Sequence, residues 1–312
     1  MKCWAHTGCR WGSCWTGCGS CISTTRQPLR NREDGMPKVR VDGANLWYEV
    51  RGDAEPPLTL IGGFALVDKQ FEFCEPYLTP YHRILQWHYR GVGKSDWTQS
   101  EPYSVERWVD DLAAILDAAG IERTALWCTS TGSSIGLRFA AKYPERMHSL
   151  IAYPFIRVDD TWRNIYEASW WVGRVFGIEQ LSRLYAGVVL PQDVLYSEEG
   201  IKYERWAKKQ YAANVNMATL KSVLDAYANV DLTADIGNIE CPTLLLMGDD
   251  SALNENERMD SASHDTLMRE FLAIKSDVDK AEIAGAGSTY CMITKPRECC
   301  EAVVAWLAGL QD

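Results

Sequence analysis

The stretch that decides the fold reads Thr124-Ala-Leu-Trp-Cys-Thr-Ser130-Thr-Gly132. It is a short apolar run, then a serine between small residues, then a glycine that opens the amphipathic segment 132–143. A small-x-Ser-x-Gly pattern between a strand and a helix is typical of a nucleophile elbow. The stretch therefore predicts a strand over 124–128, a helix over 132–143, and a candidate nucleophile at Ser130.

The residue types in this stretch suit that geometry. A tight strand-to-helix turn strains the backbone of the central residue and makes its side chain project from the turn, while small neighbours avoid collisions. The N-terminus of the following helix and the backbone N–H of Thr131 would then face a developing oxyanion. Short serine patterns are common, so the strand-turn-helix context supplies most of the specificity.

Strands and helices alternate on both sides of this stretch. Asp42-Gly43 predicts a hairpin turn between the first two strands, and an amphipathic helix is expected after Ser104. Short apolar runs alternating with helices favour a mostly parallel central sheet with helices on both faces, an α/β fold. Strands are expected at 38–41, 46–51, 58–61, 83–88, 124–128, 149–153, 243–247 and 280–283, with a last helix at 296–310.

Residues 155–230 interrupt the alternation, because they are mostly helical in pattern and rich in Trp and Tyr. We expect them to form a helical cap inserted between two halves of the core, 36–154 and 231–312. Residues 1–35 contain Cys3, Cys9, Cys14, Cys18 and Cys21 and carry a charge of +3. We expect a disordered leader, although a zinc or disulfide module and a signal peptide are alternatives. Only Cys18-Gly-Ser-Cys21 has a paired spacing, and no apolar stretch of about 7–15 residues is present.

Charge and composition exclude several classes of function. The net charge of −10 disfavours a nucleic-acid or anionic-membrane partner, and no apolar run approaches the roughly 20 residues that span a bilayer. The cysteines after the leader are scattered, as expected for reduced thiols, so we predict a cytoplasmic protein. No phosphate loop or metal cluster appears, and Gly91-Val-Gly93 lacks the third glycine of a dinucleotide motif. We expect no cofactor and no metal.

Further segments resemble the α/β-hydrolase family, specifically its small capped esterases, enol-lactonases and C–C hydrolases. They follow the family's order over most of the chain after Met36. The matching segments are Leu46-Trp-Tyr48, Leu60-Ile-Gly-Gly-Phe64, Tyr89-Arg-Gly-Val-Gly-Lys-Ser-Asp96, Tyr103-Ser104 to Asp111-Leu112, Ser130 with Gly132, Tyr143-Pro-Glu-Arg146, and more loosely Cys241-Pro-Thr-Leu-Leu-Leu-Met-Gly248 and Ala284-Gly-Ala-Gly287.

The resemblance implies the α/β-hydrolase fold, with Ser130 as nucleophile and the backbone N–H groups of Phe64 and Thr131 as the oxyanion hole. It also implies that a small hydrophobic molecule binds between sheet and cap. Trp170, Trp171 and Phe176 would then form part of the pocket wall, although packing between cap and core is the alternative interpretation.

The chain departs from the family pattern where a base and an acid should stand. Ser288 occupies the place of the histidine after Gly287, and Ser251 occupies the place of the acid. Asp250 is one residue early and would substitute if its loop shifts, but capping of a turn is the simpler explanation. A serine hydroxyl is a weak nucleophile without a base and an acid that orients it.

Among the histidines, His88 ends a strand on the same side of the sheet as Ser130. One strand intervenes in the family's order, and two spacings of ~4.8 Å exceed the reach of a direct hydrogen bond. His88 is therefore a candidate base only through a water, and a packed, hydrogen-bonded structural residue is the alternative. His82 and His148 precede strands, which places them at the opposite end of the sheet.

Two functions remain open. The first is an enzyme that uses Ser130 and the oxyanion hole on a small hydrophobic ester, lactone or ketone-type substrate, as a slow hydrolase or as a lyase or cyclase. The second is a non-catalytic pseudohydrolase that binds a small ligand or a protein partner. Loss of a triad member typically costs about 10⁴–10⁶ in rate, so efficient hydrolysis by the ordinary mechanism is not expected.

Overall fold

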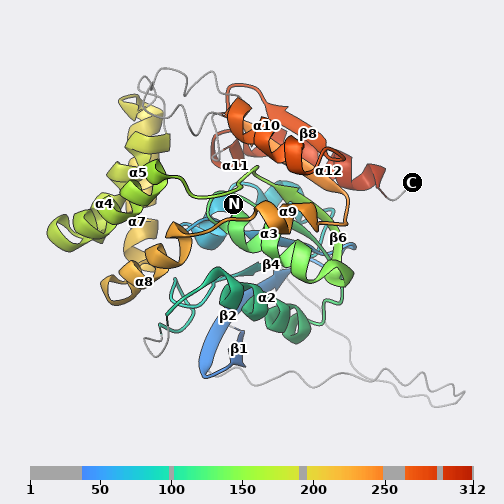
Figure 1. The fold of residues 1–312 in the computed structure, drawn as a ribbon, viewed down its shortest axis with the longest axis horizontal. Helices are drawn as coiled ribbons and strands as arrows, with labels where there is room; N and C mark the ends of the chain where they lie inside the picture. The colour runs from blue at the N-terminus through green and yellow to red at the C-terminus, as the bar shows by residue number, and fades with distance from the viewer. Residues whose placement is uncertain (1–36, 98–101, 190–194, 249–263, 287–290, 311–312) are drawn as a thin grey trace, which may run out of the picture. The chain divides into compact units, whose positions relative to one another are not determined.

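The structure is a computed structural model (Figure 1). It describes residues 37–97, 102–189, 195–248, 264–286 and 291–310. The predicted leader, 1–35, lies outside the described residues. In the part of the chain that the structure describes, none of the helices has the length and apolar character needed to cross a membrane.

The described strands form one sheet in the order β1-β2-β4-β3-β5-β6-β7-β8. The pairs β1–β2 and β2–β4 are antiparallel, and every other neighbouring pair is parallel. The prediction of a mostly parallel sheet is thus confirmed. The strands are β1 (Lys38–Val41), β2 (Ala44–Arg51), β3 (Leu58–Ile61), β4 (Ile84–Trp87), β5 (Thr124–Cys128), β6 (Met147–Ala152), β7 (Thr243–Gly248) and β8 (Asp279–Ile283).

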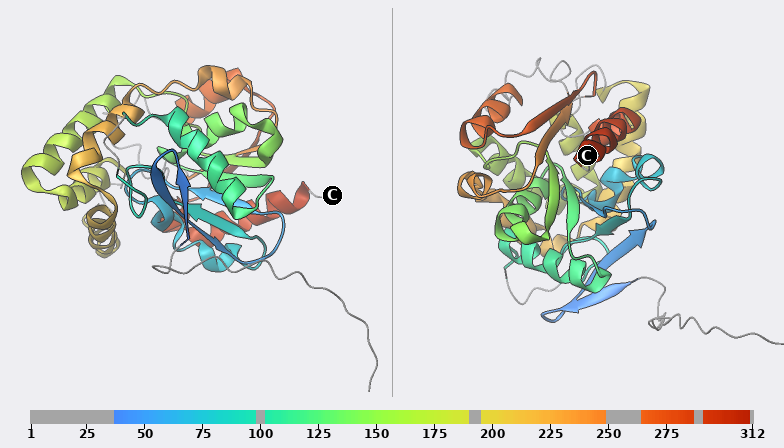
Figure 2. Two further views of the ribbon diagram at one scale, coloured as in Figure 1. Left: turned by 90° about the horizontal axis from the view of Figure 1, so that it is seen from below. Right: turned by 90° about the vertical axis from the view of Figure 1, so that its right-hand side faces the viewer.

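Helices cover both faces of this sheet, so its central strands are apolar on both sides. Along β5, Leu126 and Cys128 pack into one core, whereas Ala125 and Trp127 pack into the other, as the two-residue period of a strand requires. The first core is covered by α2 (Val105–Ala119), α3 (Gly132–Lys142) and α9 (Thr233–Gly237), and the second by α1 (Glu75–Leu78) and α12 (Pro296–Gly309). Figure 2 shows the sheet between these layers.

The other described elements outside the segment 155–230 are two 3₁₀ helices and two α-helices. The 3₁₀ helix η1 follows β3, η2 follows α3, α10 precedes β8, and α11 precedes α12. Their bounds are η1 (Val67–Phe71), η2 (Pro144–Arg146), α10 (His264–Ile274) and α11 (Cys291–Thr294).

The segment predicted as a cap leaves the sheet and returns to it at adjacent positions. The amide of Leu232 donates to the carbonyl of Ile156 at 2.8 Å, and the amide of Val158 donates to the carbonyl of Val230 at 3.0 Å. Between these positions the described chain is helical, and Figure 1 shows the helices grouped beside the sheet. They are α4 (Asp160–Phe176), η3 (Ile178–Gln180), α5 (Leu181–Val189), α7 (Glu198–Asn214) and α8 (Met217–Ala228).

These helices contact the loops that follow the carboxyl ends of β3 and β4. The side-chain amide of Asn214 donates to the carbonyl of Ala65 at 2.8 Å, and the carbonyl of Asn214 accepts from the amide of Gly93. The hydroxyl of Thr219 donates to the carbonyl of Gly91 at 3.1 Å. The carboxyl ends of the parallel strands, where ligands bind in open α/β sheets, therefore face the helical segment.

A buried ion pair fixes the loop that leads from β4 to α2. Arg90 donates to both carboxylate oxygens of Asp111, at 2.7 and 3.0 Å, and also to the carbonyl of Val41. The side chain of Asp111 is 0% exposed and that of Arg90 is 8% exposed. The indole N–H of Trp108 donates to the carbonyl of Arg90, so side chain and backbone of this residue are both held.

Candidate active site

Ser130 lies at the turn between β5 and α3, where the sequence predicts it. Its φ of 54° is in the left-handed region, which is uncommon for residues other than glycine and strains the backbone. The amide of Thr129 donates to the carbonyl of Ile61 at 3.1 Å, which ties the turn to the end of β3. Ser130 is half-buried, at the N-terminus of α3 and the carboxyl end of β5.

Two glycines allow the loop after β3 to approach this turn. A Cβ atom on Gly132 would lie 2.5 Å from the carbonyl oxygen of Gly62, and one on Gly63 would lie 2.8 Å from the hydroxyl oxygen of Ser130. Both distances are shorter than any van der Waals contact. Gly132 therefore allows backbone to approach backbone, and Gly63 leaves room for the side chain of Ser130.

The backbone N–H of Phe64, a predicted oxyanion donor, has an acceptor within the protein. It donates to the side-chain hydroxyl of Thr131 at 2.6 Å, and the neighbouring amide of Gly63 donates to the side chain of Gln70 at 2.6 Å. Sequence reasoning considered only the backbone of Thr131 and missed its hydroxyl. The sequence feature that indicates this contact is the threonine directly after the serine. Its hydroxyl can compete with a substrate oxygen for the backbone N–H of Phe64.

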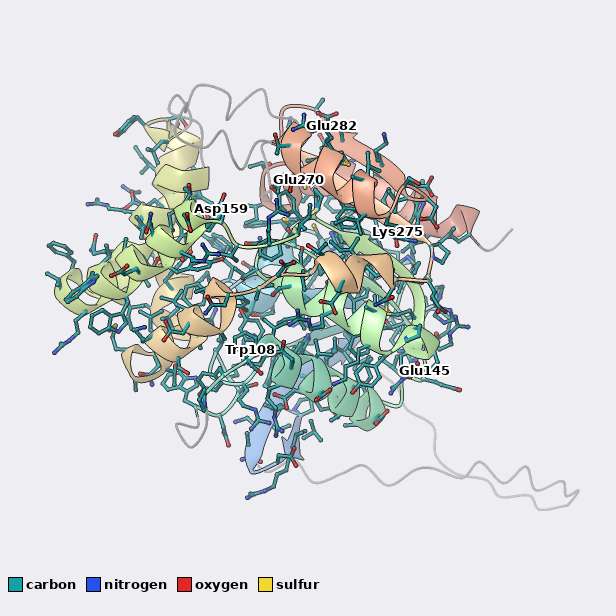
Figure 3. All side chains as sticks on the ribbon, in the orientation of Figure 1. Trp108, Glu145, Asp159, Glu270, Lys275 and Glu282 are labelled. Atoms are coloured by element: carbon teal, nitrogen blue, oxygen red, sulfur yellow. The ribbon has the colours of Figure 1, made fainter. Side chains whose placement is uncertain are left out.

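A group of buried tyrosines lies around Phe64 and Thr131, and sequence reasoning did not single them out. The rings of Tyr185 and Tyr211 each lie 6.3 Å from that of Phe64. Trp108 lies on α2 and is labelled in Figure 3. The centroid of its ring lies 5.1 Å from that of Tyr89 and 5.0 Å from that of Tyr227. The members are Tyr89 after β4, Tyr166 on α4, Tyr185 on α5, Tyr211 on α7 and Tyr227 on α8.

Burial strengthens the preference of three of these phenols for the protonated form. It raises the pKa of Tyr89, and it raises the pKa values of Tyr166 and Tyr227 well above their ordinary value. A neutral phenol donates a hydrogen bond but does not act as a base at neutral pH. The site therefore combines the Ser130 turn with neutral hydroxyl donors.

His88, the candidate base, is engaged elsewhere. Its Nδ1 accepts from the backbone N–H of Lys94 at 2.9 Å, so the neutral ring carries its proton on Nε2 and donates to Asp68 at 2.8 Å. Its ring also meets the ring of Trp47 edge-on, 4.4 Å away. With both nitrogens occupied, His88 has no lone pair to offer Ser130. This geometry matches the alternative interpretation, a packed and hydrogen-bonded structural residue.

Burial sets the protonation of this pair. It lowers the pKa of His88, against the effect of Asp68. It also acts to raise the pKa of Asp68, but the hydrogen bond and charge of His88 outweigh it and the pKa of Asp68 is lowered. Lys69 and Lys94 are the other charges that act on both groups. The pair is thus a neutral imidazole beside an ionised carboxylate.

This pair predicts a pH dependence of stability. Because the folded-state pKa of His88 is lowered, the unfolded chain binds more protons below about pH 6.5, and the free energy of unfolding should fall as the pH drops from there. Chemical denaturation at several pH values between 5 and 7 gives the free energy of unfolding as a function of pH. In His88→Gln this free energy should change less steeply with pH than in the unsubstituted protein. Some slope should remain, since the pKa values of His82 and His148 are also lowered by burial. Equal slopes in the two proteins would contradict the assignment.

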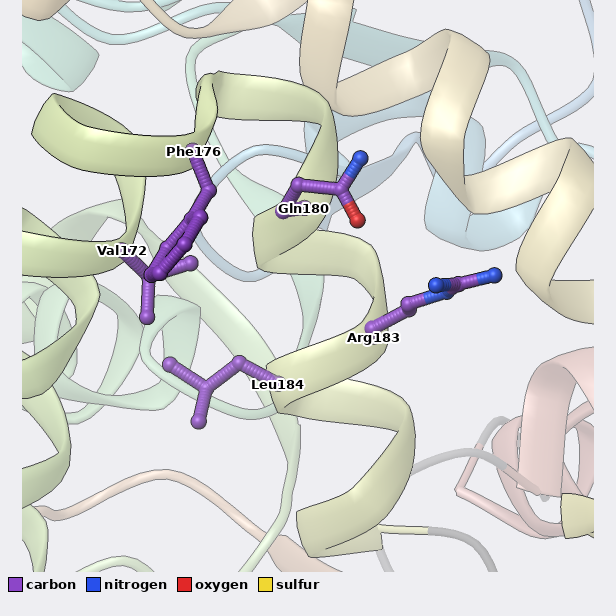
Figure 4. A pocket seen from close by; sticks show the side chains of 5 residues that line it. All are labelled: Val172, Phe176, Gln180, Arg183 and Leu184. Atoms are coloured by element: carbon purple, nitrogen blue, oxygen red, sulfur yellow. The ribbon is translucent and has the colours of Figure 1, made fainter.

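The predicted pocket-wall residues lie on α4, where two of them are largely exposed. Trp171 is 54% and Phe176 is 70% exposed, while Trp170 is half-buried, packs on the core and meets Trp171 edge-on at 4.7 Å. Phe176 lines an open pocket whose residues come from α4, η3 and α5; Ser130 is not among them. The lining residues are Val172, Phe176, Gln180, Arg183 and Leu184 (Figure 4). The role of Trp170, Trp171 and Phe176 in ligand binding stays a prediction.

The positions expected for the acid and the histidine are not covered. Asp250, Ser251 and Ser288 lie outside the described residues, so the altered triad stays a prediction from the sequence. Among the described residues, no group of three or more His, Cys, Asp or Glu side chains is arranged to hold a metal ion.

Comparison with known families and proteins gives one family and several relatives. The family described as serine aminopeptidase, S33, matches residues 82–273. The putative carbamate hydrolase RutD of Azorhizobium caulinodans is 27% identical over 222 residues, covering 70% of this chain and 82% of that protein. The 2-hydroxy-6-oxo-2,4-heptadienoate hydrolase of Pseudomonas putida is 26% identical over 179 residues, covering 56% of this chain and 64% of that protein.

Solved structures share the fold. The enol-lactonase from Burkholderia xenovorans superposes with a TM-score of 0.72 at 19% identity, covering 87% of this chain and 100% of that one. A thermophilic esterase from Thermogutta terrifontis gives a TM-score of 0.73 at 18% identity, covering 89% of this chain and 98% of that one. At these identities the likeness concerns the arrangement of strands and helices.

Proposed function

This chain belongs to the serine aminopeptidase S33 family, within the α/β-hydrolase superfamily, and on that premise we propose that Ser130 is its nucleophile. The substrate we propose is a small hydrophobic ester, lactone or related carbonyl compound. It would be held between the carboxyl ends of the strands and a cap formed by α4, α5, α7 and α8. The names of the relatives, which include a carbamate hydrolase, an esterase and an enol-lactonase, support a substrate with an acyl carbon.

The observation that carries this proposal is the strained turn at Ser130. A φ of 54° at a serine persists only where the surrounding structure enforces it, and such strain is concentrated at functional sites. Here β5, α3 and the glycine-lined loop after β3 enforce it together. The result is a hydroxyl beside the first turn of an eleven-residue helix, whose N-terminus favours negative charge.

We expect the chemistry to be slow, because Ser288 and Ser251 stand where the family has its base and acid. The hydroxyl of Ser130 would attack the acyl carbon and the bond to the leaving oxygen would break. The serine proton would pass through solvent to the departing oxygen, so that an alcohol leaves and an acyl ester stays on Ser130. Hydrolysis of that ester needs a base to activate water. Asp250, one residue before the expected acid position, remains the proposed substitute for the acid. Acylation by an activated ester is helped by its good leaving group, which needs no protonation, and hydrolysis of the serine ester has no such help. For an activated ester we therefore expect acylation to outpace hydrolysis and the acyl form to accumulate.

The test is to mix the protein with p-nitrophenyl acetate and follow release of p-nitrophenolate. We expect release of about one equivalent, followed by slow turnover, with one acetyl group on the peptide that contains Ser130 by mass spectrometry. The Ser130→Ala protein should show neither. If the folded protein releases nothing beyond the solution rate and gains no acetyl group, Ser130 is not a nucleophile.

A second candidate function is a pseudohydrolase that binds a small ligand without reacting. The hydrogen bond from the Phe64 amide to the Thr131 hydroxyl favours it, because one predicted oxyanion donor is already satisfied within the protein. The acetylation experiment separates the two candidates, since a binding protein would leave Ser130 unmodified.

Thr131 itself provides a further test of the oxyanion role. Thr131→Val keeps the shape of the side chain but removes the hydroxyl, which frees the Phe64 amide for a substrate oxygen. We expect acetylation of Ser130 to become about 5-fold faster and the free energy of unfolding to fall by about 1 kcal/mol, the net contribution of one hydrogen bond. Stopped-flow kinetics and urea denaturation measure the two effects.

The matched control is Thr131→Ser, which keeps a hydroxyl and should leave both quantities close to those of the unsubstituted protein. Slower acetylation in Thr131→Val together with an unchanged rate in Thr131→Ser would show that the hydroxyl assists the reaction. That result would reverse the role assigned to Thr131.

A further inference from the structure

We propose that the hydroxyls of Tyr89 and Tyr227 form a binding subsite for a carbonyl oxygen of an uncharged ligand, beside the Ser130 turn. This subsite would place a ketone, ester or lactone over the site that the proposed function assigns. The inference rests on the proposed function for the location of the ligand, but it concerns binding, and it can be tested in a protein that lacks Ser130.

The first observation is that both hydroxyls are buried without a partner. Tyr89 is 1% exposed and Tyr227 is 0% exposed, and neither hydroxyl makes a hydrogen bond within the described part of the chain. Buried polar groups are almost always hydrogen-bonded, because an unsatisfied one keeps the cost of leaving water without compensation. Two such hydroxyls close together indicate O–H donors whose acceptor is an atom of a bound ligand.

The second observation is that the two hydroxyls converge from different elements on the candidate site. Tyr89 follows β4, and Tyr227 lies on α8; their rings pack against the same indole, that of Trp108. Each phenol lies close enough to the other and to the Thr131 hydroxyl to affect its pKa, although neither contact has hydrogen-bond geometry. Since Thr131 adjoins Ser130, the pair is next to the candidate nucleophile.

The chemistry of the pair selects the ligand. Both phenols stay protonated, because burial raises their pKa values, so each offers one O–H donor and no charge. A carbonyl oxygen has two lone pairs and can accept from both. Charged oxygens are disfavoured in a buried place unless they are paired, and no described cationic side chain hydrogen-bonds to either phenol. An uncharged carbonyl therefore fits better than a carboxylate or a phosphate.

The neighbouring rings suit an apolar ligand body. Tyr166 lies 6.4 Å from Tyr227 by ring centroids, and Tyr185 lies 5.9 Å from Tyr211. In contrast to Tyr89 and Tyr227, the hydroxyl of Tyr185 has an internal partner, accepting from Ser169 at 3.0 Å. Tyr185 is therefore a matched control, a buried cap tyrosine whose hydroxyl is used by the fold.

The first experiment asks whether the two hydroxyls stabilise the fold. Thermal unfolding of Tyr89→Phe and Tyr227→Phe, without ligand, should give a Tm equal to or above that of the unsubstituted protein, because each change removes an unsatisfied polar group. Tyr185→Phe should lower the Tm. If Tyr89→Phe and Tyr227→Phe lower the Tm as much as Tyr185→Phe does, the hydroxyls serve the fold and the subsite is overturned.

The second experiment measures binding in the Ser130→Ala background, where no acyl transfer can occur. Acetophenone and α-methylstyrene have nearly the same shape, but only the ketone offers an oxygen. By saturation-transfer NMR titration we expect acetophenone to bind more tightly, and Tyr89→Phe or Tyr227→Phe each to weaken it about 5-fold while leaving α-methylstyrene unchanged. Equal binding of the two probes, or equal losses for both in the Phe variants, would overturn the subsite.

These outcomes are separate from those that decide the proposed function. A protein that binds acetophenone through Tyr89 and Tyr227 but is never acetylated would keep the subsite and lose the nucleophile. A protein acetylated on Ser130 whose Phe variants bind acetophenone normally would keep the nucleophile and lose the subsite.

Discussion

Replacing Ser288 by histidine is expected to raise turnover of p-nitrophenyl acetate about 10²-fold. Resemblance to the α/β-hydrolase family places the catalytic base at this position, directly after Gly287. In one serine protease, loss of the acid costs about 3 × 10⁴ in rate and loss of the histidine costs about 2 × 10⁶, so a histidine without its acid is still roughly 10²-fold better than none. Steady-state release of p-nitrophenolate measures the gain.

The control for this prediction is the same substitution with Ser130→Ala. Serine and histidine act as a unit, so the whole gain should vanish in the double variant. Ser130→Ala alone should cost the unsubstituted protein much less steady-state turnover than it costs Ser288→His. A Ser288→His protein that folds normally, yet turns over no faster than the unsubstituted protein, would refute the assignment of this position.

Replacing Asp111 by alanine is expected to lower the free energy of unfolding by about 3–5 kcal/mol. The change would leave the guanidinium of Arg90 buried without its carboxylate, and breaking one side of a buried pair typically costs that much. Asp111 accepts two hydrogen bonds from Arg90 with its side chain 0% exposed. Urea denaturation followed by tryptophan fluorescence measures the loss of stability. We also expect the substitution to loosen the loop between β4 and α2.

Asp117→Ala is the matched control, because Asp117 lies on the same helix and also pairs with an arginine. Its contact with Arg146 is 2.8 Å long, but its side chain is 69% exposed, and exposed pairs contribute about 1 kcal/mol or less. Similar losses for Asp111→Ala and Asp117→Ala would show that burial is not what makes the Arg90–Asp111 pair important.

Elements built from neighbouring residues agree closely with the sequence predictions. The strand and helix around Ser130 were expected at 124–128 and 132–143 and lie at Thr124–Cys128 and Gly132–Lys142. The last helix was expected at 296–310 and lies at Pro296–Gly309. Apolar runs and glycines determine the secondary structure of the few residues around them, so these elements can be predicted from short stretches of sequence.

The candidate site was only partly predictable for the opposite reason. Phe64 and Thr131 are 67 residues apart, and the hydrogen bond between them exists because β3 and β5 are neighbours in the sheet. No local pattern indicates that the Thr131 hydroxyl would reach that amide. The hydrogen bond of His88 was equally difficult to predict, because its partner Asp68 lies on η1, 20 residues away in the sequence.

By itself, the sequence determined the turn at Ser130, the alternation of strands and helices, and the family, because each depends on short runs of residue types. Only the tertiary structure decided which hydroxyls surround that turn. Tyr89 and Tyr227 come from a strand end and a distant helix, and they meet because both pack on Trp108. Hydrogen bonds and burial depend on distances of a few ångströms between segments far apart in the chain, and packing alone sets those distances.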